Sequence, residues 1–206
     1  MTDYFALFDE LRRPWLDEDA LKAKFLKLAA ESHPDRIHFA TEKEKQAATD
    51  LYTALNQAHN TLREPKDRLL HLLELERGVK PTGIEGVPPE IMECFMEVGQ
   101  LCREVDGFLA NRATVTSPLL KVQMFERSME WTERLNDLAF RLDALRSSVM
   151  GKLLDMNHLW EAAPPLGEVR RPTALQLDEL ERLYRTLSFV SRWISQLRER
   201  TVRLTL

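Results

Sequence analysis

Apolar residues recur at steps of three and four along most of the chain, a spacing that predicts amphipathic α-helices. No segment alternates with the period of two that is typical of strands, so we predict an all-α protein. Prolines, glycines and polar clusters separate the apolar runs. The expected helices cover residues 3–11, 18–32, 42–63, 66–76, 89–110, 118–158 and 174–204.

Residue types that favour helix starts support these limits. A short polar side chain at the N-cap accepts a hydrogen bond from a free backbone N–H, and Glu or Gln three residues later completes a capping box. Such positions are Asp17, Thr41 with Glu44, Ser117 before Pro118, and Thr173 with Gln176.

The last three helices carry long apolar seams in which steps of three and four alternate. This pattern predicts near-parallel helices in a three-helix bundle or a coiled-coil-like hairpin. The first seam consists of Ile91, Phe95, Val98, Cys102, Val105 and Leu109. The second consists of Met124, Trp131, Leu135, Leu138, Leu142, Leu145 and Val149, and the third of Leu180, Leu183, Leu187, Val190, Ile194 and Leu197.

A stretch rich in glycine and proline, residues 78–89, separates the first four helices from the last three. Such composition is typical of a linker between domains. We therefore expect an N-terminal domain at 1–76, a linker at 77–88 and a C-terminal helical bundle at 89–206.

Composition narrows the class of protein. The chain has 206 residues, of which 44% are hydrophobic and 30% charged, and its formal net charge of −4 argues against bulk attraction to nucleic acid or anionic membranes. No apolar run is long enough to span a membrane, and the N-terminus lacks the build of a signal peptide. Cys94 and Cys102 share one predicted helix and suit neither a disulfide framework nor a zinc site, so we expect a reducing, cytoplasmic environment and no metal or cofactor.

The segment Ser32–Arg36 joins two strongly helical segments that we expect to pair antiparallel. Pro34 prevents the first helix from continuing, which predicts a tight polar loop at the tip of a hairpin. His33 and Asp35 flank this proline with no evident structural role. A metal or acid–base site is a poorer interpretation, because no third ligand lies nearby in sequence.

The order of features in the first 76 residues resembles that of a J-domain. A short aromatic helix precedes a basic helix, a His-Pro-Asp loop and a long helix. The matching residues are Asp3, Tyr4, Phe5, Leu7, Phe8, Phe25, Leu28, His33, Pro34, Asp35, Arg36, Leu55, Asn56, Gln57, Ala58, Leu62 and Pro65.

This resemblance implies that the chain stimulates ATP hydrolysis by a DnaK-class heat-shock chaperone. In J-domains, the His-Pro-Asp loop and the basic face of the second helix dock on the ATPase domain. The corresponding residues here are His33, Pro34, Asp35, Arg36, Lys22, Lys24 and Lys27. Leu26 departs from the basic pattern, which favours a specialised chaperone partner; the alternative for the lysines alone is an ordinary solvated face.

The remaining sequence resembles the HscB-type iron–sulfur co-chaperones in particular. The Asp3-Tyr4-Phe5 start, Asn56-Gln57-Ala58, and the run from Pro65 through Arg68 to Leu72-Leu73 match this family, and a helical bundle follows. The chain has neither the Gly/Phe-rich region nor the zinc module of general J-proteins. An N-terminal tetracysteine extension is also absent, so the resemblance is to the bacterial form.

In that family, the first helix of the bundle binds the iron–sulfur scaffold protein. The resemblance assigns this role to Met92, Met96 and Glu97, together with Phe189 on the last helix. Met92 and Met96 lie on a stripe about 100° from the seam, and flexible methionines suit a docking surface. The alternative is that these methionines only widen the core.

Together these features predict a J-domain co-chaperone that is not itself an enzyme. It is expected to stimulate a DnaK/HscA-class chaperone and to deliver an iron–sulfur scaffold protein to it, without binding nucleic acid or membranes. The alternatives are a J-domain adaptor for a client unrelated to iron–sulfur assembly and a purely structural helical protein.

Overall fold

The computed structural model describes residues 2–32, 41–81 and 86–205, and in these ranges it contains helices and no strand. None of the described helices is both long and apolar enough to cross a membrane. The elements are α1 (Tyr4–Leu7), α2 (Glu18–Glu31), α3 (Glu42–Arg63), α4 (Pro65–Arg77), the 3-10 turn η2 (Pro89–Ile91), α5 (Met92–Thr114), α6 (Pro118–Glu161), α7 (Arg171–Ala174) and α8 (Leu177–Thr205).

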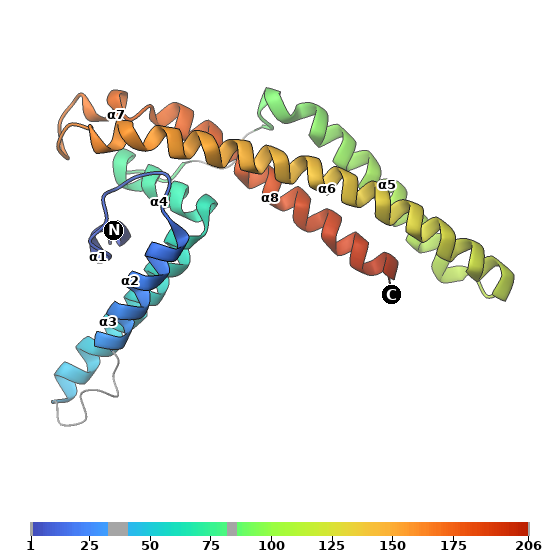
Figure 1. Ribbon diagram of the computed structural model, residues 1–206, viewed down its shortest axis with the longest axis horizontal. Coiled ribbons are helices and arrows are strands. Elements are labelled where there is room, and N and C mark those ends of the chain that lie inside the picture. Colours follow the sequence, from blue (N-terminus) through green and yellow to red (C-terminus); the bar gives the residue numbers. More distant parts are fainter. Residues whose placement is uncertain (1, 33–40, 82–85, 206) are drawn as a thin grey trace. The chain divides into compact units, whose positions relative to one another are not determined.

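The contacts divide the chain into two compact units. The first combines Met1–Thr82 with Lys152–Tyr184, and the second combines Gly83–Gly151 with Arg185–Leu206. Both α6 and α8 (Figure 1) therefore contribute residues to each unit. This partition follows contacts rather than a single linker, and the limits 1–76, 77–88 and 89–206 stay a prediction about domains.

Several predicted helix limits are confirmed. The Asp17 carboxylate accepts the N–H of Ala20 at 2.7 Å and caps α2. Thr41 and Glu44 form a reciprocal capping box at the start of α3, and the hydrogen bonds from Thr41 lower the pKa of Glu44. Helix α4 ends at Gly78, whose φ of 71° is the left-handed conformation that glycine adopts without steric cost.

Two predicted limits are wrong. The first helix covers only Tyr4–Leu7, because the backbone turns at Asp9, where φ is 50°. The predicted capping box of Thr173 and Gln176 does not form either. Thr173 lies inside α7, and Gln176 has a φ of 50°, so the backbone breaks there and α8 begins one residue later.

Helices α2 and α3 lie side by side in the first unit (Figure 1). The Phe25 ring stacks on His59 with centroids 4.2 Å apart, and Leu55, Ala58 and Leu62 are buried. Leu51, which the sequence places on the same seam, is 43% exposed. The buried residues of α3 are thus confined to its C-terminal part, from Leu55 to Leu62.

A buried arginine ties the base of this hairpin together. Arg68 is 1% exposed, and its guanidinium donates to the Pro14 carbonyl at 2.9 Å and to the Leu62 carbonyl at 2.6 Å. Burial lowers the pKa of Arg68 to about 10. The side chain thus satisfies one carbonyl from the last turn of α3 and another from the loop before α2.

The segment 152–184 packs on the same unit through polar pairs. Asn157 accepts the N–H of Trp15 and donates to the Trp15 carbonyl, each at 3.0 Å. Arg171 donates two hydrogen bonds to the Glu76 carboxylate at 2.8 and 3.0 Å. These contacts join residues more than 90 positions apart in the sequence.

The second unit is a bundle of α5, part of α6 and part of α8. Leu101, Phe108, Trp193 and Leu204 are core residues outside the predicted seams, and the rest of the core consists of seam residues, as the sequence predicts. Among them are Ile91, Val98, Val105, Leu135, Leu138, Leu142, Val190, Ile194 and Leu197, each at most 5% exposed.

Substitution of Arg68 tests whether its buried guanidinium stabilises the base of the α2–α3 hairpin. We expect Arg68→Ala to lower the free energy of unfolding by roughly 3–5 kcal/mol, because it leaves a cavity and orphans two carbonyls. Urea denaturation measures this loss. Arg63→Ala, at an exposed site in α3, is the control and is expected to change stability by less than about 0.5 kcal/mol. Equal effects of the two substitutions would contradict the role of Arg68.

His71 is a second buried polar group of the first unit. Its Nε2 accepts the N–H of Tyr4 at 3.2 Å, and its ring stacks on Tyr4 with centroids 4.5 Å apart. Burial lowers the pKa of His71. A proton on Nε2 would place two donors face to face, so the fold requires the neutral ring.

Stability should therefore fall on acidification. Because the pKa of His71 is lower in the folded state, the unfolded chain binds more protons just below pH 6.5, and the free energy of unfolding decreases as pH falls through this window. His71→Gln keeps an acceptor for Tyr4 and should flatten the decrease between roughly pH 7 and 5. Burial also lowers the pKa of His59, so His59 still contributes to the pH dependence of stability in the His71→Gln variant. The double variant His59→Gln/His71→Gln should therefore show an even smaller loss of stability on acidification. An unchanged slope in both variants would rule out this origin.

Candidate functional site

The first predicted site surrounds the connection between α2 and α3. His33, Pro34, Asp35 and Arg36 lie outside the described residues, so their assignment as chaperone-binding residues stays a prediction. The structure does describe the two helices on either side. Helix α2 ends at Glu31 and α3 begins at Glu42, which leaves the predicted loop between paired helices.

The three lysines of α2 differ in their surroundings. Lys22 and Lys27 are exposed and form no ion pair with any described residue. Lys24 instead donates to the Glu10 carboxylate at 2.6 Å and to the Asp9 carbonyl at 3.2 Å. Its charge therefore neutralises Glu10 and stabilises the turn after α1, while Lys22 and Lys27 are exposed on the same helix as the exposed Leu26.

The second predicted site lies at the start of α5. Met92 is 44% exposed and Met96 is 62% exposed, so neither fills the core. Phe95, which the sequence places in the seam, is also 41% exposed, and this prediction is wrong. Leu101 and Phe108 are buried on the other edge of the seam, so the buried stripe is centred away from Phe95. We call Met92, Phe95 and Met96 the methionine patch.

An aromatic cluster connects the methionine patch to α8. The Trp193 ring lies 6.2 Å from the Phe95 ring and 5.5 Å from the Phe189 ring, centroid to centroid. Phe189 is half-buried, whereas Trp193 is 4% exposed and forms the floor between the two phenylalanines. The structure thus brings Phe189 next to the patch, and Trp193 is a residue of this site that sequence reasoning missed.

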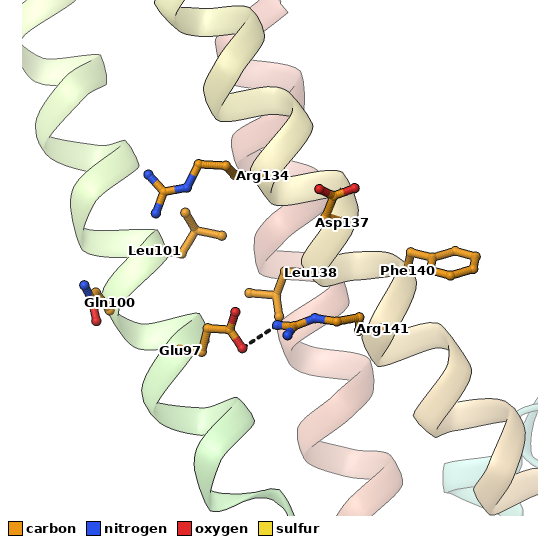
Figure 2. Close-up of a pocket in the computed structure, with 8 residues that line it drawn as sticks. All are labelled: Glu97, Gln100, Leu101, Arg134, Asp137, Leu138, Phe140 and Arg141. Carbon is orange, nitrogen blue, oxygen red and sulfur yellow. Dashed lines mark hydrogen bonds and ion pairs between the residues drawn. The ribbon is translucent and has the colours of Figure 1, made fainter.

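Glu97 lies on the opposite flank of α5. Its carboxylate forms an ion pair with Arg141 of α6, across a shallow groove between the two helices (Figure 2). The groove is lined by Glu97, Gln100, Leu101, Arg134, Asp137, Leu138, Phe140 and Arg141. Because both partners are about half exposed, the pair contributes little stability, and Glu97 remains accessible to a partner protein.

The described residues hold no cluster of three or more His, Cys, Asp or Glu side chains in an arrangement that suits a metal ion. Cys94 and Cys102 are both free thiols. Burial raises the pKa of the Cys102 thiol, which disfavours the reactive thiolate.

Comparison with solved structures identifies the class of fold. HscB from Vibrio cholerae matches with a TM-score of 0.65 over 98% of this chain and 99% of its own, at 18% sequence identity. Human co-chaperone protein HscB matches with a TM-score of 0.58 over 98% of this chain and 81% of its own, at 20% identity. The predicted fold is confirmed: the chain is all-α and combines a J-domain hairpin with a helical bundle.

Sequence comparison points to the same proteins. A co-chaperone protein HscB homolog from Chromobacterium violaceum is 28% identical over 164 residues, which are 78% of this chain and 75% of that protein. One from Azoarcus sp. is 41% identical over 73 residues, 35% of this chain and 41% of that protein. No model of a known protein family matches. The resemblance of this chain to the HscB-type co-chaperones is thereby confirmed.

Proposed function

We propose that this chain is a J-domain co-chaperone acting in iron–sulfur cluster assembly. It stimulates the ATPase of a DnaK/HscA-class chaperone through His33–Arg36 and the basic face of α2. It delivers an iron–sulfur scaffold protein through the bundle and has no catalytic activity of its own. The observation that supports this proposal most directly is an exposed apolar patch at the start of α5, within a fold shared with HscB proteins.

The chaperone-facing half of the proposal combines a loop with a charged helix face. Lys22 and Lys27 present exposed positive charge that forms no ion pair with a described residue, and such charge accelerates encounter with an acidic surface even where it adds little affinity. Lys24 is already paired with Glu10, so its role is to fix the turn after α1. We therefore assign steering to Lys22 and Lys27 ahead of Lys24.

The client-facing half depends on the methionine patch. Methionine side chains adapt to a partner's shape, and rigid aromatic rings provide large contact areas. Phe95 and Phe189 supply such rings, and Trp193 supports both from below. Glu97 on the other flank of α5 adds a charge that can pair with a basic group of the scaffold protein.

The loop is tested by His33→Gln. We expect this variant to bind the scaffold protein normally and to lose stimulation of the chaperone's ATPase, because the docking loop is altered and the bundle is not. Steady-state ATP hydrolysis with purified chaperone measures the effect. His158→Gln, at an exposed histidine of α6, is the matched control and should stimulate like wild type. If His33→Gln stimulates the chaperone's ATPase as wild type does, the proposed J-domain activity is contradicted.

The methionine patch is tested by Met92→Ala/Met96→Ala. Because both side chains are largely exposed, the melting temperature should stay near that of wild type. Binding to a purified iron–sulfur scaffold protein should weaken at least tenfold, or about 1.4 kcal/mol, since few apolar anchors dominate interface energy. Isothermal titration calorimetry measures the affinity.

Leu154→Ala is the matched control, because Leu154 is 48% exposed on α6 and lies outside the methionine patch. It should bind the scaffold protein normally. If the double variant also folds and binds normally, the patch is not the scaffold site, and a J-domain adaptor for another client becomes the better interpretation.

A further inference from the structure

A second exposed apolar surface lies on α6. Leu119, Val122, Phe125 and Met129 follow one another at steps of three, three and four, and each is between 59% and 72% exposed. This spacing places them on one side of the helix, about 145° from the core residues Leu135 and Leu142. We call these four residues the outer stripe. Contiguous exposed apolar surface of this kind marks interaction sites in soluble proteins.

An acidic row begins beside the C-terminal end of the outer stripe and continues along α6 past it. It consists of Glu126, Glu130, Glu133 and Asp137, which are spaced at four, three and four residues. All four are exposed, and none forms an ion pair with another described residue. The row therefore presents uncompensated negative charge next to exposed apolar side chains.

The arginines of the same helix are turned toward α5 and are occupied. Arg127 lies over the Phe108 ring at 5.8 Å, and Arg134 forms an ion pair with Glu104 at 3.1 Å. Arg141 pairs with Glu97, and Figure 2 shows Arg134 and Arg141 directed toward α5 while Phe140 points away from it. Arg134 and Arg141 thus pair with acids of α5, and the acidic row of α6 has no ion pair among the described residues.

From this separation of charge we propose that the outer stripe and the acidic row together form a docking site for a basic amphipathic helix of a partner protein. Apolar residues of the partner at i, i+3, i+4 and i+7 would cover the outer stripe, and Lys or Arg on one flank would meet the acidic row. An anionic membrane is disfavoured by the same acids. So is an antiparallel pairing of α6 with a second copy of this chain, because a two-fold axis perpendicular to the helix would bring equal acidic rows together.

This site is independent of the proposed co-chaperone activity, and its test needs neither chaperone nor scaffold. The probes are two synthetic helical peptides with the same leucine seam, one flanked by lysines and the other by glutamates. Fluorescence anisotropy should show that wild type binds the basic peptide at least tenfold more tightly than the acidic one, with an affinity that falls as salt increases.

Two double variants separate the contributions. Phe125→Ser/Met129→Ser and Glu130→Lys/Glu133→Lys should each weaken binding of the basic peptide at least tenfold at unchanged melting temperature, because all four side chains are exposed. Val202→Ser and Glu199→Lys, at exposed positions of α8, are the matched controls and should bind like wild type. Met92→Ala/Met96→Ala should also bind like wild type, which distinguishes this site from the methionine patch.

The proposal is overturned if wild type does not discriminate between the two peptides, or if the double variants bind as wild type does. Sedimentation equilibrium measures the oligomeric state of wild type and variant, and so tests whether a second copy of the chain covers the outer stripe. A wild-type dimer that Phe125→Ser/Met129→Ser converts to a monomer would assign the outer stripe to a second copy of the chain instead.

Discussion

The first unit depends on the ion pairs that the buried carboxylate of Glu76 forms with two arginines. The Glu76 side chain is 3% exposed and lies between Arg12 at 3.1 Å and Arg171 at 2.8 Å. Burial alone would raise the pKa of Glu76, but hydrogen bonds from Arg171 and Arg12 outweigh it and lower the pKa. A buried charge is tolerated only when it is paired and hydrogen-bonded, so all three residues must be placed together. One carboxylate thereby fixes the turn after α1, the end of α4 and the start of α7.

The residues that stabilise the fold are largely distinct from those that we assign to binding. Arg68, His71 and Glu76 are enclosed, and each satisfies backbone groups or charges from distant parts of the sequence. Met92 and Met96 are exposed and contribute little to the core. Substitutions at the two groups should therefore separate in experiment, the first affecting unfolding and the second affecting affinity. Trp193 is the exception, because it belongs to the core and also supports the methionine patch.

Local sequence signals were sufficient for most elements of the fold. Asp17 and Thr41 predict helix starts because capping is a contact between residues three apart, and the seam of α8 predicts its buried face correctly. Phe95 was placed wrongly because its burial depends on which edge of α5 the neighbouring helices cover. The pairs Trp15–Asn157 and Glu76–Arg171 join residues 142 and 95 positions apart, and no local pattern encodes such partners. The methionines were identifiable from their angle to the seam, whereas Trp193 looked like any other core residue.

The distribution of charge on α5 and α6 gives the two exposed apolar surfaces different chemistry. On α5, Glu97 is paired with Arg141, so charge near the methionine patch is partly compensated. The acids beside the outer stripe have no such partner among the described residues. The acidic row would attract a basic helix to the outer stripe, and the methionine patch would attract it less. The same row would repel an acidic partner. Discrimination between partners depends on such repulsion as much as on attraction. Because Arg134 and Arg141 of α6 pair with Glu104 and Glu97 of α5, these two arginines compensate charge on α5 and leave the acidic row without an ion pair among the described residues.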